Sequence, residues 1–377
     1  MKNKTLPTLL CLCLGSMPLL ALKGKDNDTA EKQKPQAAAA SPSASQARPT
    51  AAPRKVISRL KPFALYARNL EILQSTEPRD AQKKEALLKK AARAVDLQIT
   101  ANVNLTELTD LMALFTNVRS LYISGNDGND LPLLPCPEKL ESLRLVYNRF
   151  QTIQNITHYT NLRTFRTGSQ LLSATNQDPN QTERLAVLTQ LHNLHTLDFQ
   201  HLFRKLFTLD GRASDNSALL TRILEGNPEI KAFTCTGRLT EEVVQALGTL
   251  PLRRLELFGS AIDDDKFALL PFNTLKELSV CGRGRLKNLA PLQGSHLRVL
   301  KLHGNNDLSD TLPQFICSMP HLEELYLTAR LTDAQAKPLL QLSQRLHKLD
   351  VSSDSARMSA EMYQRLKDAF GKKMIER

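Results

Sequence analysis

Residues 297–305 read LRVLKLHGN, a phrase of the form apolar-x-x-apolar-x-apolar that is followed by turn residues. The same phrase occurs ten times, and its second apolar residue falls at Leu121, Leu143, Phe165, Leu197, Phe233, Leu255, Leu278, Leu300, Leu325 and Leu349. The steps between these residues are 22, 22, 32, 36, 22, 23, 22, 25 and 24. A partial copy with Leu97 and Ile99 precedes them. Such a repeat predicts a stacked array, because a single unit cannot bury its own apolar face.

The phrase resembles that of the leucine-rich repeat family. The copies that run from Thr106 to Asn126 and from Leu286 to Asn305 are similar to the 22-residue class of internalin-type bacterial surface proteins. The resemblance implies an α/β fold over residues 96–354: a leucine-rich repeat solenoid, or horseshoe, with a parallel concave sheet and helical or irregular convex segments. The family's asparagine after the strand is present only at Asn126, Asn148 and Asn305, so we expect an incomplete ladder of turns.

The segments between strands carry helix-start signals. In five of them an apolar residue is followed by a capping residue and then by an acid: Leu239-Thr240-Glu241, Ile262-Asp263-Asp264, Leu308-Ser309-Asp310, Leu331-Thr332-Asp333 and Met358-Ser359-Ala360-Glu361. A side-chain oxygen at the cap accepts from free N–H groups, and an acid is favourable at the positive end of a helix. We therefore interpret the aspartates at 263–265 as a capped helix start and not as a metal site.

The two ends of the array are predicted to be helical caps. Residues 56–95 form the first cap, with one helix over 56–73 and an amphipathic, lysine-rich helix over 81–95. Residues 355–377 form the second cap, with a helix over 359–370 whose Met362, Leu366 and Phe370 share one face. Caps of this kind cover the apolar ends of a repeat array.

The N-terminus is predicted to direct export. Residues 1–22 combine two lysines with a short apolar run and are interpreted as a signal peptide. The run is shorter than the ~20 apolar residues that a membrane-spanning helix needs. Residues 23–55 are rich in Ala, Pro, Ser and Gln and are interpreted as a disordered linker. These segments predict a secreted, periplasmic or cell-surface protein.

The net charge of +12 belongs mostly to the N-terminal part of the chain. Residues 1–93 contain 18 Lys or Arg and 7 Asp or Glu, whereas the remaining residues contain 32 and 31. Because the repeats are balanced in charge, we expect no nucleic-acid partner. Membrane contact is limited to the N-terminal segment, where the helix over 81–95 is either a cap or a basic surface helix.

Outward-facing positions of the predicted strands form a candidate protein-binding surface. Side chains alternate along a strand, so the residues between and after the inward apolar positions face the concave side. The candidates are Tyr122, Arg144, Arg166, Asp198, Glu256, Phe258, Lys301, His303 and Tyr326. Tyr and Arg often carry binding energy in protein interfaces. The insertions at 169–182 and 202–217, which lengthen two repeats, are an alternative binding region.

No pattern of catalytic, metal-binding or cofactor-binding residues is found. The sequence has no Gly-rich phosphate loop after a strand, no Ser in a nucleophile elbow and no His/Cys metal spacing. Outside the leader the four cysteines, Cys136, Cys235, Cys281 and Cys317, are interpreted as reduced, since Cys235 faces inward and Cys281 outward two strands away. We expect a non-enzymatic protein without a cofactor that binds a protein partner on its concave face. The alternative is an envelope scaffold that acts through its basic N-terminal segment.

Overall fold

The computed structural model describes residues 62–100, 105–168, 181–200, 213–259, 262–282, 286–304, 312–328, 331–351 and 358–375. All of them belong to one unit that spans Ile57–Arg377. The predicted leader at 1–22 and linker at 23–55 lie outside the described residues. Within the described residues, no helix is both long enough and apolar enough to cross a membrane.

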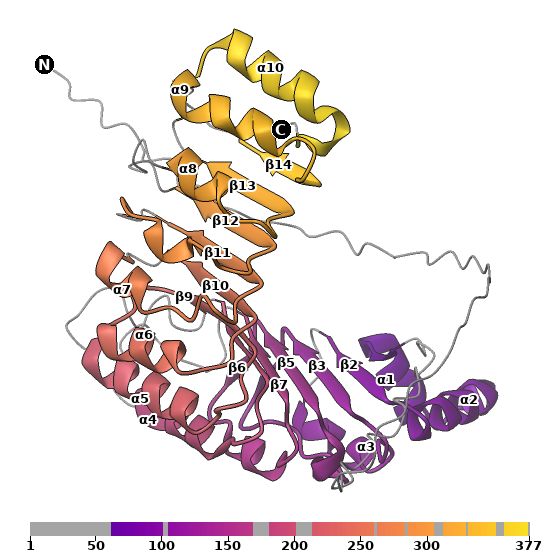
Figure 1. The fold of residues 1–377 in the computed structure, drawn as a ribbon. Coiled ribbons are helices and arrows are strands. Elements are labelled where there is room, and N and C mark those ends of the chain that lie inside the picture. Colours follow the sequence, from indigo (N-terminus) through magenta and orange to yellow (C-terminus); the bar gives the residue numbers. More distant parts are fainter. Residues whose placement is uncertain are drawn as a thin grey trace, which may run out of the picture. The chain divides into compact units, whose positions relative to one another are not determined.

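Twelve parallel strands form one open sheet in the order of the sequence, apart from two short strands that pair separately. Figure 1 shows them side by side, with the return helices along one side of the sheet. The strands are β1 (Phe63–Leu65), β2 (Asp96–Ile99), β3 (Ser120–Ser124), β5 (Ser142–Val146), β7 (Thr164–Thr167), β8 (Thr196–Phe199), β9 (Ala232–Thr236), β10 (Arg254–Phe258), β11 (Glu277–Cys281), β12 (Val299–His303), β13 (Glu324–Thr328) and β14 (Lys348–Asp350). The separate pair is β4 (Asp127–Gly128) and β6 (Arg149–Phe150). This open parallel sheet with helical return segments confirms the predicted α/β solenoid.

The return segments are short helices. The α-helices are α1 (Ala67–Gln74), α2 (Ala81–Ala92), α3 (Thr109–Met112), α4 (Gln181–Leu185), α5 (Ala213–Glu225), α6 (Glu241–Gly248), α7 (Asp264–Ala268), α8 (Leu312–Cys317), α9 (Asp333–Ala336) and α10 (Ala360–Phe370). The 3-10 helices are η1 (Pro78–Asp80), η2 (Leu105–Leu108), η3 (Pro137–Lys139), η4 (Gln154–His158), η5 (Ala186–Gln190), η6 (Ala290–Leu292), η7 (Lys337–Leu342) and η8 (Gly371–Lys373).

The apolar phrase builds the core as predicted. In β12, for example, Leu300 and Leu302 are fully buried, while the residues on either side of each are half-exposed. Leu297, the first apolar residue of the same phrase, is also fully buried. Each strand therefore adds two inward side chains and one preceding anchor to a continuous apolar spine. Burial of this kind contributes about 25 cal/mol per Å² of apolar surface, which makes the stacking of units the main source of stability.

The predicted helix over 56–73 is wrong in its first described part. Phe63–Leu65 is strand β1, which pairs with β2 in parallel, and the helix begins only at Ala67. Phe63 and Leu65 point inward and Ala64 outward, as in the other strands. Their spacing from Leu60 repeats the apolar phrase, and Pro62 fixes an extended-compatible φ before the strand. The predicted helix over 81–95 is present as α2, and its Leu87, Leu88 and Ala91 pack against the core.

Helices begin at four of the five predicted positions, and the fifth, at Ser309, lies outside the described residues. The side chains of Asp263, Thr332 and Ser359 cap their helices as predicted, whereas Thr240 makes no side-chain cap hydrogen bond to α6. Asp263 accepts the backbone N–H of Lys266 at 3.1 Å, which accounts for one member of the aspartate cluster. Asp264 has a different task, because its carboxylate accepts the N–H groups of Lys287 and Asn288, one repeat further along the chain. The cluster therefore caps one helix and fastens the next repeat to it.

The C-terminal helix is present as predicted. Ser359 caps α10, and Met362, Leu366 and Phe370 are buried on one face of it. The chain then returns to the sheet, where Met374 forms a parallel bridge with Leu349 of β14 and the N–H of Ile375 donates to the Leu349 carbonyl. The last strand of the sheet is therefore partly covered by the chain that follows the helix.

The turns after the strands use two devices. Asn126 and Asn148 form the predicted ladder: the Asn148 side chain accepts from the Asn126 N–H and donates to the carbonyl of Ile123. Asn305 lies outside the described residues. The residue before the ladder position adopts a positive φ in these repeats as well: φ is 69° at Gly125, 55° at Tyr147 and 72° at Gly304. The Gly304 N–H donates to the Thr328 carbonyl, so the turn also joins neighbouring repeats.

Candidate functional site

The nine predicted surface residues all lie on the same face of the twelve-stranded sheet. Strand register aligns Tyr122 with Arg144, Arg144 with Arg166, and Arg166 with Asp198. The same column continues through Thr234, Glu256, Ser279, Lys301, Tyr326 and Asp350. Phe258 and His303 belong to the next outward column, where both align with Cys281. At ~4.8 Å per strand the face is about 53 Å long, which is enough for a standard protein interface.

In the middle of the face, charged groups are paired with one another. The Arg254 guanidinium lies 2.8 Å from the Glu256 carboxylate and 3.6 Å from that of Glu277. Glu256 also accepts a hydrogen bond from the Thr234 hydroxyl at 3.3 Å. Because these groups satisfy one another, this part of the face has little unbalanced charge to offer a ligand.

The C-terminal part of the face is also internally paired. The Tyr326 hydroxyl donates to Glu324 at 2.8 Å, Lys348 lies 3.1 Å from the same carboxylate, and the Lys301 ammonium lies 5.2 Å from the centre of the Tyr326 ring. Burial raises the pKa of Tyr326, and its bond to Glu324 adds to this. Burial alone would raise the pKa of Glu324, but the bonds from Tyr326 and Lys348 outweigh it and lower that pKa. The His303 ring is 3.1 Å from the Thr328 hydroxyl.

The N-terminal part of the face differs because its two arginines are exposed and unpaired. Arg144 and Arg166 sit on adjacent strands, and among the described residues neither forms an ion pair with a carboxylate. The Arg144 guanidinium lies 5.4 Å from the centre of the Tyr122 ring, a cation–π contact that holds the side chain over the sheet. Ser142 and Thr164 align beside the arginines and are half-exposed.

Asp198 is the acidic neighbour of this arginine pair. Burial raises the pKa of its carboxyl, while the N–H of Gln200 and the charges of Arg166 and Arg144 act in the opposite direction. Its side chain accepts the Gln200 N–H at 3.0 Å. Asp198 is thus half-buried, and its carboxylate already accepts a backbone N–H. It therefore neutralises the charge of the two exposed arginines only in part.

Tyr147, which directly follows the strand of Arg144, is a further exposed aromatic residue and was not among the predicted residues. It follows strand β5, its side chain is 59 % exposed, and its φ is 55°. Among the described residues it is the only non-glycine residue with a positive φ, a conformation that costs about 1–2 kcal/mol for a side chain of this size. The signal was a tyrosine at the position where Gly125 and Gly304 stand in other repeats. We name Tyr122, Arg144, Tyr147 and Arg166 the arginine–tyrosine patch.

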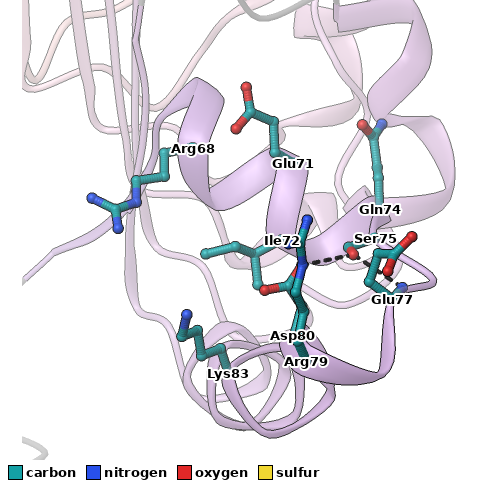
Figure 2. A pocket seen from close by; sticks show the side chains of 9 residues that line it. All are labelled: Arg68, Glu71, Ile72, Gln74, Ser75, Glu77, Arg79, Asp80 and Lys83. Carbon is teal, nitrogen blue, oxygen red and sulfur yellow. Dashed lines mark hydrogen bonds between the residues drawn. The ribbon is translucent and has the colours of Figure 1, made fainter.

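The insertions were an alternative binding region, and most of them lie outside the described residues. Only the parts from Gln181 and from Ala213 onward, which begin α4 and α5, are described. A surface hollow occurs elsewhere, in the N-terminal cap between α1 and the start of α2 (Figure 2). It is lined by both signs of charge, including Arg68, Glu71 and Lys83, and the Ser75 hydroxyl donates to Asp80 within it. The residues that line the hollow include no His or Cys, and none of them belongs to the strands that carry the patch.

The four cysteines outside the leader are free thiols. Cys235 is buried and points inward, and burial raises the pKa of its thiol to about 12. Cys281 lies on the outward face, where its sulfur is 3.3 Å from the Ser279 hydroxyl. The predicted separation of Cys235 and Cys281 is therefore confirmed. In the described part of the chain no three His, Cys, Asp or Glu side chains gather into a metal-binding group.

Strand–turn–helix units of one repeating phrase, stacked in register into an open parallel sheet, define a leucine-rich repeat solenoid. No protein-family model and no curated protein sequence matches the chain. Among solved structures, an internalin of Listeria monocytogenes is similar, with 16% identity, a TM-score of 0.44, and coverage of 81% of this chain and 96% of that one. A leucine-rich repeat protein of Leptospira interrogans has 18% identity, a TM-score of 0.34, and coverage of 76% and 86%. The Toll–Spatzle complex of Drosophila contains a chain with 16% identity, a TM-score of 0.31, and coverage of 74% and 33%.

Proposed function

We propose that this protein is an exported, non-enzymatic leucine-rich repeat protein that binds an acidic segment of a protein partner at the arginine–tyrosine patch. One observation carries the proposal: among the described residues two exposed arginines stand side by side without paired carboxylates, and one of them lies against the ring of Tyr122. Export to the periplasm, cell surface or medium is supported by the leader and linker expected at 1–22 and 23–55.

The chemistry of the patch favours a carboxylate-bearing segment. A guanidinium group binds a carboxylate through two parallel hydrogen bonds, and two adjacent arginines can hold two such groups or one group from both sides. Ser142 and Thr164 place hydroxyl groups beside them. Tyr122 and the exposed Tyr147 add aromatic surface, and Tyr and Arg are the residue types most enriched among the residues that dominate interface energies.

The remainder of the face is proposed to contribute shape and not most of the binding energy. Glu256 and Tyr326, which the sequence placed among the candidates, already have partners in Arg254 and Glu324. A ligand that bound these side chains would first have to break the existing pairs. Each new exposed ion pair with the ligand would contribute at most about 1 kcal/mol, so the net gain in binding energy would be small. We therefore assign the energetic centre to strands β3, β5 and β7.

The first test compares two pairs of substitutions on the same face. We expect Arg144→Gln with Arg166→Gln to weaken binding of a partner about a hundredfold or more, because the loss of two charge-assisted contacts costs roughly 1.5–3 kcal/mol each. The matched control is Lys301→Gln with Lys348→Gln, which removes the same charge from the C-terminal part and should change capture less than twofold. Quantitative pull-down from native extract with the full chain measures both. Equal capture by all three proteins, or loss only with the lysine pair, would contradict the proposal.

A change of opposite sign provides a second test. Asp198→Asn removes the only acidic group aligned with the arginine pair while it keeps a side chain that can accept the Gln200 N–H. We expect an acidic partner, once captured, to bind this variant two- to fivefold more tightly, since a repulsive carboxylate is lost. Isothermal titration calorimetry with the partner's acidic segment measures the change. Weaker binding would mean that the Asp198 carboxylate accepts a hydrogen bond from a donor group of the partner. The partner would then not be acidic at this point.

The alternative of a scaffold that acts through the basic N-terminal segment is not favoured. The apolar side chains Leu87 and Leu88 of α2 pack on the repeat core and are therefore not available to enter a membrane. Its cations are partly engaged: Lys84 donates to the Ser75 carbonyl and Lys89 pairs with Glu85. In this structure the segment is the first turn of the solenoid, because β1 is hydrogen-bonded to β2.

A further inference from the structure

A second charged surface runs along the edge of the sheet where the strands begin. In each phrase, the residue directly after the first apolar position lies at this edge. It precedes the two columns of outward-facing residues that form the strand face. In six consecutive repeats, from β7 to β12, this residue is cationic or histidine: Arg163, His195, Lys231, Arg253, Lys276 and Arg298. We name this row the cationic rim.

The rim is continuous at the level of the backbone. The N–H of each rim residue donates to the carbonyl of the preceding one at 2.8–2.9 Å, from His195 to Arg298. Neighbouring rim residues are therefore separated by the strand spacing of ~4.8 Å, and the six span about 24 Å. Four of them, Arg163, Arg253, Lys276 and Arg298, are exposed.

Carboxylates neutralise this row only at a few points. Lys231 lies 3.7 Å from Glu229, and Arg298 is paired with Glu323 at the end of the row. Glu277, on the strand of Lys276, is 3.6 Å from Arg254. Within the described residues Arg163, Arg253 and Lys276 form no ion pair, so a run of exposed positive charge remains between β7 and β12.

The neighbours of the rim are mostly polar at its first two residues, and its last residue, Arg298, stands two residues after His296, whose exposed ring stacks on that of His321 at 5.3 Å. Thr164 and Thr196 follow two of the rim residues, and Asn161 and Asn193 precede the same two. The amide groups of both asparagines donate to carbonyls of the preceding repeat, which leaves their side-chain oxygens as acceptors on the surface. A protein partner would need apolar or aromatic anchors, and single-stranded nucleic acid needs aromatic side chains for its bases to stack on.

We propose that the cationic rim binds a linear anionic polysaccharide, one that carries carboxylate or sulfate groups at regular intervals. Five Lys or Arg side chains and one His in consecutive repeats, set at the strand spacing, complement a polymer that carries negative charge at short intervals. The hydroxyl and amide groups of Thr164, Thr196, Asn161 and Asn193 suit sugar hydroxyls. Among the described residues, the half-exposed apolar side chains directly beside the row are only Ala232 and Val299, which is too little apolar surface to favour insertion into a membrane. This site adjoins the arginine–tyrosine patch at Thr164, but its cations are not members of the patch, and the proposal does not depend on the patch.

The test uses the full chain and a fluorescent heparin oligosaccharide, followed by anisotropy at several salt concentrations. Arg163→Gln, Arg253→Gln and Lys276→Gln together should weaken binding about tenfold or more and flatten the salt dependence, because about three ionic contacts are lost. The matched control, Lys83→Gln, Lys90→Gln and Arg93→Gln on and after α2, removes the same charge and should change binding less than threefold. Circular dichroism of both variants establishes that they fold.

Three further probes decide between ligand classes. An alginate oligosaccharide should compete with heparin, whereas an oligothymidylate, a polyglutamate peptide and phosphatidylglycerol vesicles at equal charge should compete at least tenfold less well. Equal weakening by the two triple variants would overturn the proposal, because binding would then follow net charge and not the rim. Tighter binding of oligothymidylate than of either polysaccharide would also overturn it and would indicate a nucleic-acid site.

Discussion

Asn227→Ala is expected to lower the free energy of unfolding by about 3 to 5 kcal/mol. The Asn227 side chain is fully buried, and its oxygen accepts the N–H of Leu194 at 2.9 Å. Its amide donates to the carbonyls of Leu191 at 2.6 Å and Ile223 at 2.8 Å. Alanine would leave three buried backbone groups without this partner, and each unsatisfied group costs about 1–3 kcal/mol. Urea unfolding followed by circular dichroism measures the loss.

Asn193→Ala is the matched control for this prediction. Its amide also donates to a backbone carbonyl of the preceding repeat, that of Thr160 at 2.8 Å, but the side chain is exposed. Water replaces such a bond, so we expect a loss below about 0.5 kcal/mol. Similar losses for the two variants would show that burial does not set the strength of these contacts. Hydrogen exchange on the Asn227→Ala variant would locate the destabilised backbone groups, which we expect at the end of α5 and the start of β8.

Gly304→Ala is expected to destabilise the protein by about 2 to 4 kcal/mol. Two costs add at this position. The φ of 72° is unfavourable for any residue with a Cβ, and a Cβ built there lies 2.6 Å from the backbone oxygen of Gly282 in the neighbouring turn. A backbone atom cannot rotate away as the end of a side chain can, so the two turns must separate and lose contact. Thermal unfolding followed by circular dichroism measures the shift.

Gly294→Ala separates these two costs. Gly294 has the same φ of 72°, but no heavy atom lies within 4 Å of the added Cβ. We expect this variant to lose only the conformational cost of about 1–2 kcal/mol. The difference between the two variants then measures how tightly neighbouring turns are stacked. If both lose the same amount, the close approach of Gly304 to Gly282 has no energetic consequence.

Most of the fold could be predicted because the inward positions are decided by local alternation of apolar and polar residues. The phrase located ten strands and the partial copy located β2, each with the correct face inward. Strand β1 was missed although Leu60, Phe63 and Leu65 repeat the phrase, because the step from Phe63 to Leu97 contains two α-helices and is longer than the common period of the repeat. The link from Asp264 to Lys287 and Asn288 was also missed, since helix capping alone accounts for an aspartate at that place in the sequence.

The candidate site was predictable in position and not in electrostatics. Alternation placed all nine residues on one face, but pairing depends on side-chain rotamers that the sequence does not specify. Arg254 reaches Glu256 on its own strand, whereas Arg144 lies over a tyrosine and remains unpaired. The cationic rim was overlooked for a simpler reason: its residues precede the two columns that the alternation argument considers, and the balanced charge of the repeats concealed a local excess.

The bridge between Met374 and Leu349 restricts where additional repeats can be inserted during evolution. Duplication of an interior unit, such as the one that carries β11, would supply a new strand with compatible edges on both sides, since its neighbours differ from it by only one residue in period. A copy added after β14 would have to displace Met374 and Ile375 from the last strand. Length variation among descendants of this chain should therefore arise inside the array and not after β14.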